Sequence, residues 1–560
     1  MHFLLWSGVI IAGVIIMLAI YDRFIQTKNL VYANFPVIGR FRYLAHELRP
    51  FVRQYFFDDN DFVNRIVIDW ILHVSGGKSG YFSFDKFDSS GNLHNGQYDM
   101  IHSSTPLNSD EMKPKFPLVG EKRKQPFQFG SYIYRSAMSL GALSFEATAA
   151  MSAACVDSGA PFNTGEGGFA VQHIPRVPFS KDKKYFKYKE LGSIGKILLQ
   201  ATPSTRLKNY IIDFFGTRLV EEGKYDLYLF CQKSKTYYTI DWDAPLDVFP
   251  KAGELTAEFG NVIFQIGSGL YGLKKHTTDG SIEFNWERFQ KIMSFCRAIE
   301  IKLAQGAKQS GGILKAIKNT KTVSEIRGVE PGHDLISPNR FPFYEKDGEK
   351  EFLEFTNELS EKSGGKPVGA KLVISDESNI EPLVKEMSQN PDIALDFVTI
   401  DGGDGGSGAA PIYLSTLFGK KIYDALQITI DILEKYNIRK DTRVFAAAKL
   451  YTPFMSAKAL AIGADAIGNA RSIMIAGGCI RAGLCSGDYG NCPVGMATMK
   501  KKNRRAYRQT WDKKVEQISN FINAHNKGLI QVASIAGLES PHMLEKKHIA
   551  KQMKENLQKK

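Results

Sequence analysis

The stretch Asp396–Gly408, DFVTIDGGDGGSG, decides the fold. Its apolar half, residues 397–400, is a short hydrophobic run of the kind that forms a strand buried in a parallel sheet. The glycine-rich half predicts a loop whose backbone can approach a ligand closely. Farther along, IYLSTLF at 412–418 and ALQITIDILEKY at 425–436 predict helices of an outer layer. A strand, a glycine-rich loop and a helix in this order predict a βα unit.

Seven other segments follow the same pattern of a short apolar run that ends in a glycine-rich or polar loop. They are YIYRSAMSLGALS (132–144), PFNTGEGG (161–168), NVIFQIGSG (261–269), AIEIKLAQG (298–306), PVGAKLVIS (367–375), TRVFAAAKL (442–450) and ADAIGNARS (464–472). Eight parallel strands with intervening helices predict an α/β fold, a (β/α)8 TIM barrel. Its active site is expected at the carboxyl ends of the strands.

One interval breaks this spacing. Residues from about 175 to 259 separate the second and third predicted strands by more than a helix needs, so we expect an insertion there. Within it, DLYLFCQKSKTYYTIDW (226–242) predicts a β-hairpin with its turn near 232–236. The expected organisation is a transmembrane anchor at 1–25, an N-terminal extension at 26–125, the barrel at 126–500 and a helical tail at 501–560. The charged end of that tail is typical of a solvated helix.

The N-terminal segment predicts a membrane anchor. Residues 3–20, FLLWSGVIIAGVIIMLAI, carry no charge and are long enough as a helix to span a hydrocarbon core. A cleaved signal peptide is the alternative, but no basic region precedes the run and no small-residue cleavage site follows it. Arg23, Lys28, Arg40 and Arg42 follow the span, so the positive-inside rule predicts a single-pass protein with a cytoplasmic catalytic domain.

The composition narrows the function class. The formal net charge is +13, but 72 basic residues are interspersed with 59 acidic ones, which disfavours a nucleic-acid partner. The net positive charge equally suits binding to an anionic membrane surface or to an acidic redox partner. The densest basic run, residues 500–505, is either a docking patch or a solvated helix face. A cytoplasmic location also predicts that the six cysteines are not disulfides.

Half of the cysteines lie together after the last predicted strand. GGCIRAGLCSGDYGNCPVG places Cys479, Cys485 and Cys492 in one short stretch. Clustered cytoplasmic thiols are typical of metal ligands, and three thiolates without a nearby histidine favour an iron–sulfur cluster over zinc. The expected cluster is [3Fe–4S]. The remaining cysteines, at 155, 231 and 296, are expected to be packing residues.

Glycine-rich loops at several strand ends predict a phosphate-bearing cofactor. The 401–408 loop, Lys449 and the 468–471 loop follow the last three strands, where barrels commonly hold phosphate. GSGLYG at 267–272 matches a dinucleotide motif formally, but a polar loop follows it instead of a helix, so no nicotinamide site is expected. Lys302, Lys308 and Lys371 lie at strand ends, and each should face an anion because a buried unpaired ammonium is costly.

At these residues the sequence resembles the FMN-binding glutamate synthase family over about residues 132–498. The resemblance lies in an ordered set of motifs: SAMSLGALS, NTGEGG, QIGSGLYG, EIKLAQGAK, LISP, AKLV, GGDGGSGAAP, FAAAKL and CPVGMAT. It implies FMN at the barrel mouth, a [3Fe–4S] cluster beside it and reductive amination of 2-oxoglutarate to glutamate.

The resemblance also implies site residues. Glu166 and Lys308 are the implied catalytic residues, and together with Arg327 they would hold the 2-oxo acid. The residues implied for the cofactor are Met138, Ser139, Gln265, Lys302, Lys371, Asp401, Gly402, Gly403, Gly405, Gly406, Lys449, Gly468, Asn469 and Arg471. Guanidinium and ammonium groups clamp carboxylates, and a flavin delivers hydride, so the residue types suit this chemistry.

The sequence departs from the family pattern in two places. Six residues separate Cys485 from Cys492 where the family has four, and Ile313 replaces a family glutamine. Two alternatives therefore stay open: an FMN and iron–sulfur oxidoreductase for another oxo or amino acid, and a non-catalytic electron-transfer subunit of a membrane complex. Electrons are expected from a separate donor such as ferredoxin or a membrane redox protein, and ammonia from solution or a partner.

Overall fold

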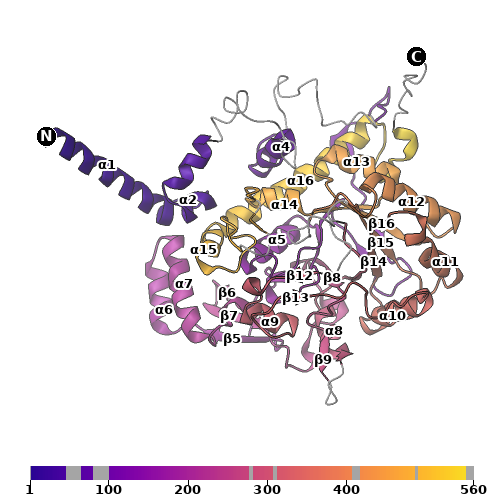
Figure 1. Ribbon diagram of the computed structural model, residues 1–560, viewed down its shortest axis with the longest axis horizontal. Helices are drawn as coiled ribbons and strands as arrows, with labels where there is room; N and C mark the ends of the chain where they lie inside the picture. Colours follow the sequence, from indigo (N-terminus) through magenta and orange to yellow (C-terminus); the bar gives the residue numbers. More distant parts are fainter. Residues whose placement is uncertain are drawn as a thin grey trace.

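A closed barrel of eight parallel strands forms the centre of the protein. The computed structural model describes residues 2–45, 65–79, 100–276, 282–306, 312–406, 417–482, 484–485 and 490–549. In barrel order the strands are β3 (Ile133–Arg135), β4 (Pro161–Asn163), β8 (Asn261–Ile266), β11 (Ala298–Lys302), β14 (Val368–Leu372), β15 (Phe397–Asp401), β16 (Arg443–Ala447) and β17 (Ala466–Asn469), which pairs with β3 (Figure 1). All eight predicted strands and the TIM-barrel fold are confirmed.

The barrel interior changes from apolar to polar along the strands. At the amino ends, the side chains of Phe397, Phe445 and Ala298 form a small core, and the hairpin of β1 (Leu118–Val119) and β2 (Phe127–Gln128) adds Phe127 to it. Because side chains alternate between the two faces of a strand, Glu300 lies one layer above Ala298. The polar groups of the site therefore stand on an apolar floor.

Helices surround the barrel and follow its strands. They are α5 (Phe145–Asp157), α8 (Trp286–Met293), α9 (Lys321–Arg327), α10 (Glu349–Lys362), α11 (Glu381–Gln389), α12 (Ile422–Lys435), α13 (Pro453–Ile462) and α14 (Arg471–Ala476). Local sequence sets their starts: the Ser144 hydroxyl accepts a hydrogen bond from the Ala147 amide and caps α5. The predicted helix at 425–436 is α12. Most of the one expected at 412–418 lies outside the described residues.

The predicted insertion between the second and third barrel strands is present. It contains α6 (Ser193–Ala201), α7 (Thr205–Leu219) and a small sheet of β5 (Phe186–Glu190), β7 (Thr236–Ile240) and β6 (Leu229–Cys231). Strands β6 and β7 form the expected hairpin. The insertion has its own apolar cluster, made of Leu191, Leu199, Ile212, Val220 and Tyr237. Two further hairpins, β9 (Lys274–His276) with β10 (Ile282–Phe284) and β12 (Ile313–Leu314) with β13 (Leu335–Ile336), lie in loops between barrel elements.

The N-terminal segment leaves the body of the molecule as one long helix, α1 (His2–Ile20), continued by a π-helical turn, η1 (Tyr21–Ile25). The helix over Trp6–Ile25 is long and apolar enough to cross a bilayer. The Asp22 carboxylate fastens its end to the body, because it accepts hydrogen bonds from the Arg40 guanidinium at 2.6 Å and from the Val37 amide at 3.0 Å. Two short helices follow, α2 (Leu30–Asn34) and α4 (Arg65–Ser75).

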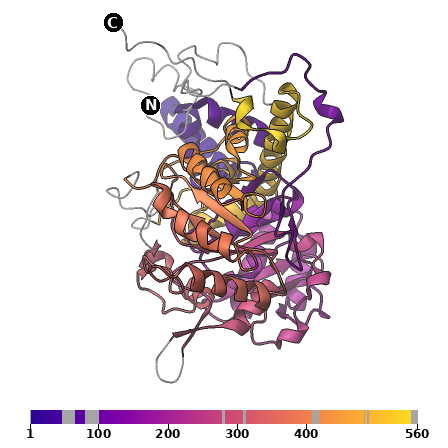
Figure 2. The same cartoon turned by 90° about the vertical axis from the view of Figure 1, so that its right-hand side faces the viewer.

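The C-terminal helices are part of the core. α15 (Lys501–Gln509) leads into α16 (Trp511–Ile535), which lies along α5 and buries Ile518, Phe521 and Leu529 (Figure 2). Most of the end of the tail, where a solvated helix is expected, lies outside the described residues, which stop at 549. Residues 546–548 form a single 3-10 turn, and Ile549 pairs with Met100.

A buried ion network joins α15 to the insertion. The Arg504 guanidinium donates to the Glu146 carboxylate at 2.8 Å and to the Asp226 carboxylate at 2.7 Å. Arg508 also contacts Glu146 and reaches Asp213 on α7. Burial raises the pKa of Glu146, but the two guanidinium groups outweigh burial and hold that pKa at about 2. The basic run at 500–505 is therefore not one solvated face, because Arg504 is buried in this network.

Candidate active site

A buried carboxylate lies at the centre of the barrel. Glu300 on β11 accepts hydrogen bonds from the Asn163 and Gln265 side-chain amides, each at 2.7 Å, and from the Thr399 hydroxyl at 2.5 Å. These donors come from three other strands. Because charged buried groups need several partners, this arrangement fixes the side chain of Gln265 below the barrel mouth.

Two of the predicted lysines form ion pairs at the mouth. The Lys302 ammonium lies 2.7 Å from the Glu166 carboxylate, and the Lys371 ammonium lies 2.9 Å from the Asp401 carboxylate. Burial lowers the pKa of Lys371, but the carboxylates of Asp401 and Glu300 hold it above its usual value. Both lysines thus face anions, as expected. Lys308 lies outside the described residues.

Arg327, at the end of α9, brings a third cation to the same place. Its guanidinium donates to the Leu140 carbonyl at 3.1 Å and lies 4.8 Å from the centre of the Tyr271 ring. It is buried, which lowers its pKa, while Tyr271 and the Glu166 carboxylate act in the opposite direction. The Nε atom is buried and has no hydrogen-bond partner. Glu166, Lys302 and Arg327 are therefore neighbours, and one guanidinium N–H remains available to an acceptor.

The loops after the first two strands pack closely on each other. A side chain at Gly165, where φ is +69°, would place its Cβ 2.5 Å from the Ser139 amide nitrogen. Gly167 is also restricted, because its Cβ would lie 2.7 Å from the Leu140 carbonyl oxygen and 3.2 Å from the Arg327 guanidinium. Met138 is buried and Ser139 is half-buried beside this contact. Glycine is thus required in NTGEGG so that Glu166 can lie next to Arg327.

The predicted phosphate loops converge at the ends of the last three strands. A Cβ on Gly406 would lie 2.7 Å from the Arg471 guanidinium, so this guanidinium rests against bare backbone. Lys449 is exposed and has a φ of +43°. Within the described part of the chain, neither cation forms an ion pair with a carboxylate. Asn469 donates to the Leu450 carbonyl at 2.9 Å, which holds the two loops together.

Several glycines of the 401–408 loop have a packing role instead. A Cβ on Gly403 would meet the Gly419 carbonyl oxygen at 2.3 Å, and one on Gly402 would meet Asp404 and Ile422. Gly405 lies against Asp401, and Gly468 lies against the Tyr134 hydroxyl. The loop therefore needs glycine to pack against its neighbours, and Gly406 is the position that faces a cation.

The three clustered cysteines lie near one another after α14. Burial raises the pKa of the Cys479 thiol to about 11, and the neighbouring thiols of Cys492 and Cys485 act in the same direction. The Lys318 ammonium donates to the Cys485 carbonyl at 3.0 Å. Among the described residues, no three side chains are arranged to hold a single metal ion. A cluster distributes its thiolate ligands over several iron atoms, so it does not require them to converge on one point.

Comparison with known proteins decides the family. The model of the conserved region in glutamate synthase matches residues 86–539. The chain belongs to the glutamate synthase family. A glutamate synthase large subunit-like protein of Bacillus subtilis is 30% identical to it over 94% of this chain and 90% of its own length. An archaeal-type glutamate synthase [NADPH] of Thermotoga neapolitana is 30% identical over 43% of each chain. The chain is thus a glutamate synthase-like oxidoreductase.

The fold of this family member also resembles solved flavoenzymes at low similarity. A flavocytochrome b2 variant with sulfite bound aligns with a TM-score of 0.40 and 11% identity, covering 93% of this chain and 86% of that one. A likeness at this level carries no argument about chemistry.

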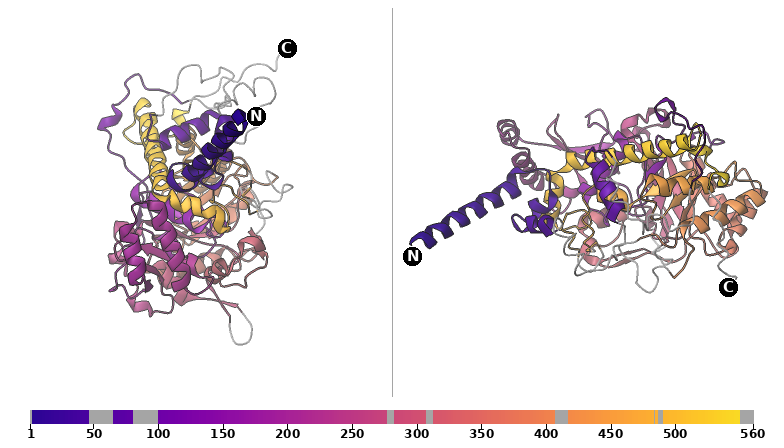
Figure 3. Two further views of the ribbon diagram at one scale, coloured as in Figure 1. Left: turned by 90° about the vertical axis from the view of Figure 1, so that its left-hand side faces the viewer. Right: turned by 90° about the horizontal axis from the view of Figure 1, so that it is seen from above.

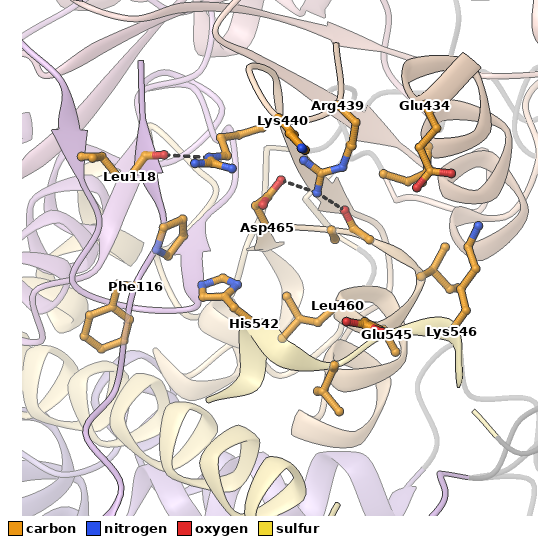
Figure 4. A pocket seen from close by; sticks show the side chains of 18 of the residues that line it. Phe116, Leu118, Glu434, Arg439, Lys440, Leu460, Asp465, His542, Glu545 and Lys546 are labelled. Atoms are coloured by element: carbon orange, nitrogen blue, oxygen red, sulfur yellow. Dashed lines mark hydrogen bonds and ion pairs between the residues drawn. The ribbon is translucent and has the colours of Figure 1, made fainter. Parts of the chain in front are cut away.

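A cleft of about 850 Å³ lies on the opposite face of the barrel (Figure 4). It is lined by the segment before β1, by the ends of α12 and α13 and by residues 542–547. Its arginines are satisfied within the protein: Arg439 contacts Asp465 at 3.0 Å, and Arg443 donates to the Leu118 carbonyl at 2.8 Å. Barrel enzymes carry their catalytic groups at the carboxyl ends of the strands, so this cleft is not the active site of a family member.

Sequence reasoning missed Glu300. The available signal was its place in AIEIKLAQG, where it shares the inward face of the strand with Lys302. A carboxylate at an inward position of a buried strand predicts a polar centre, because it must be paired.

Proposed function

We propose that the protein catalyses reductive amination of 2-oxoglutarate to glutamate, with FMN and a [3Fe–4S] cluster as cofactors and electrons from a separate donor. The observation that carries this proposal is the grouping of Lys302, Lys371 and Arg327 around buried carboxylates at the barrel mouth. The net reaction joins a 2-oxo acid, ammonium, two electrons and two protons to give the amino acid and water.

The residues at the mouth fit FMN. Arg471 and Lys449 supply cations without carboxylate partners in the described part of the chain, as a phosphate site requires. Gln265 and Lys371, both fixed by acidic neighbours, would contact FMN, as would Met138 and Ser139. When bound, FMN supplies the hydride that reduces a substrate imine. The backbone of residues 402–406 would also contact FMN, with Gly406 next to Arg471.

The residues next to Arg327 fit a dicarboxylate. Its unpartnered Nε–H and the Lys302 ammonium are donors for carboxylate oxygens, and Lys308 is proposed as a third. The Glu166 carboxylate, between Lys302 and Arg327, can hold a proton or orient ammonia. Because Gly167 has no side chain, the Arg327 guanidinium can occupy its position next to the loop.

The cluster would be held by Cys479, Cys485 and Cys492, which lie after the eighth strand and within electrostatic reach of one another. Electrons would enter there from ferredoxin or a membrane redox protein, and ammonia would come from solution or a partner. The exposed apolar helix α1 supports a single-pass anchor with the barrel in the cytoplasm.

The proposal is tested on the full-length protein purified without oxygen. We expect a visible spectrum with flavin and iron–sulfur absorption, and reoxidation of the reduced flavin when 2-oxoglutarate and ammonium are added together, with glutamate as the product. Reoxidation by a different oxo acid would assign another substrate, with Ile313 the first residue to examine. Both cofactors without any substrate-dependent reoxidation would identify an electron-transfer subunit.

Replacement of Arg327 should weaken substrate binding selectively. A desolvated charged partner contributes about 2 to 5 kcal/mol, so Arg327→Ala should weaken 2-oxoglutarate binding roughly tenfold to a few thousandfold. Titration of the reduced flavin with 2-oxoglutarate measures this affinity. Arg340→Ala, which removes an exposed guanidinium, is the control and should change nothing. Loss of flavin in Arg327→Ala would instead place Arg327 in the cofactor site or the fold.

A further inference from the structure

The insertion carries an apolar helix face that has no protein partner in the described structure. On α6, Ile194 and Ile197 are 71% and 63% exposed, and Leu198 beside them is also exposed. Their spacing puts all three on one side of the helix. The opposite side, with Leu199, packs into the cluster of the insertion itself. The exposed apolar side chains of α6 therefore do not contribute to the core of the insertion.

The same region is fastened to the end of the membrane anchor. On α7, the Tyr210 ring lies 6.1 Å from the Phe24 ring of η1, and the Arg206 guanidinium donates to the Asp22 carbonyl at 3.3 Å. Asp22 in turn is held by Arg40 and the Val37 amide. These contacts fix the end of α1 relative to α7. They therefore also fix the position of α6 and α7 relative to a bilayer that α1 crosses.

Two views show which end of the molecule would face the bilayer. In Figures 1 and 3, α1 leaves the molecule at the same end at which α6 and α7 stand, and both helices lie beside the point where α1 meets the body. α11 stands at the opposite end in Figure 1. A bilayer crossed by α1 would thus face α6 and not α11.

The chemistry of the exposed side chains suits a lipid surface. Leu207 and Phe214 on α7 add exposed apolar area. The Arg218 guanidinium lies 3.5 Å from the centre of the Phe214 ring, so a cation adjoins this apolar area. Lys196 lies on the other side of α6 and pairs with Glu190 at 3.5 Å. Large apolar residues flanked by basic ones are typical of helices that lie in the headgroup region, where the cations contact lipid phosphates.

We propose that the α6–α7 pair of the insertion lies on the surface of the bilayer that holds α1, with Ile194, Ile197 and Leu198 inserted among the lipid headgroups. The proposal rests on the proposed anchor. It gives the insertion a role: a second contact that sets the orientation of the barrel over the membrane. The lipid it fits is an anionic phospholipid.

The test places a fluorescent label at single introduced cysteines in the full-length protein. Ile197→Cys reports on α6, Ile11→Cys on the anchor and Lys385→Cys on α11, and each is labelled with bimane. The proteins are reconstituted into vesicles of anionic and neutral phospholipid that carry spin-label quenchers both near the headgroups and along the acyl chains. The unsubstituted protein, treated identically, gives the contribution of the native cysteines.

We expect quenching at positions 197 and 11 and none at 385. Adding Ile194→Glu should remove most quenching at 197 and leave that at 11 unchanged, because a carboxylate beside anionic headgroups opposes insertion. Quenching at 11 alone would overturn the surface contact and keep the anchor. Quenching at 197 without 11 would keep the surface contact and overturn the anchor. Equal quenching at 197 and 385 would overturn the proposal.

Discussion

Cys485→Ala should abolish iron and sulfide incorporation, with loss of donor-dependent glutamate formation. The proposed cluster needs three thiolates, and a protein site left with two cannot hold it. Iron and acid-labile sulfide per flavin, measured on anaerobically purified protein, give the result. Flavin content should stay at the level of the unsubstituted protein, because none of the residues proposed to hold FMN is a cysteine.

Cys231→Ala is the matched control, since this thiol is half-buried in the insertion and has no predicted ligand role. It should keep its iron. If both variants contain as much iron as the unsubstituted protein, the assignment of the cysteine ligands is wrong. If both lose it equally, the loss comes from destabilised folding.

Glu146→Ala should lower the free energy of unfolding by about 3 to 5 kcal/mol, because it leaves the guanidinium groups of Arg504 and Arg508 buried without their shared carboxylate. Denaturant titration followed by tryptophan fluorescence measures the change. Glu287→Ala is the control: its carboxylate is 67% exposed, and its ion-pair partner Lys291 also donates to the Trp242 carbonyl at 3.0 Å, so its loss should have a much smaller effect. Equal effects of the two substitutions would contradict a central role for the network.

The same carboxylate predicts a pH dependence. The folded-state pKa of Glu146, about 2, lies below the ordinary value of 4.5 for this carboxyl group. A lowered carboxyl pKa means that its stabilisation is complete above about pH 4.5 and is lost as the pH falls toward 2. The difference in stability between the unsubstituted protein and Glu146→Ala should therefore be constant near neutrality and shrink in acid.

The barrel could be predicted from the sequence because its signals are local. Each strand, such as 397–401, is a short apolar run beside its own glycine-rich loop, and each could be recognised without its partners. Part of the candidate site could be predicted for the same reason, since Lys302 and Lys371 lie at the ends of such strands and Arg471 follows the last one. Glu300 was missed because its significance depends on donors from three other strands.

The ion network was missed for a related reason. Arg504 lies in a basic run that has the pattern of a solvated helix, and its partners are 278 and 358 residues away in sequence. No local pattern indicates which of several neighbouring cations will be buried. Only the path of α15 between α5 and the insertion selects Arg504 and Arg508.

The network also determines when folding can be completed during synthesis. The carboxylates of Glu146, Asp213 and Asp226 are translated long before the arginines that neutralise them, and α1 leaves the ribosome before either. The nascent chain would carry a cluster of uncompensated acids until its last helices emerge. Closing these contacts across such sequence separations is slow, so termination before Arg504 should leave a chain that has all eight barrel strands but lacks the arginines that neutralise these carboxylates.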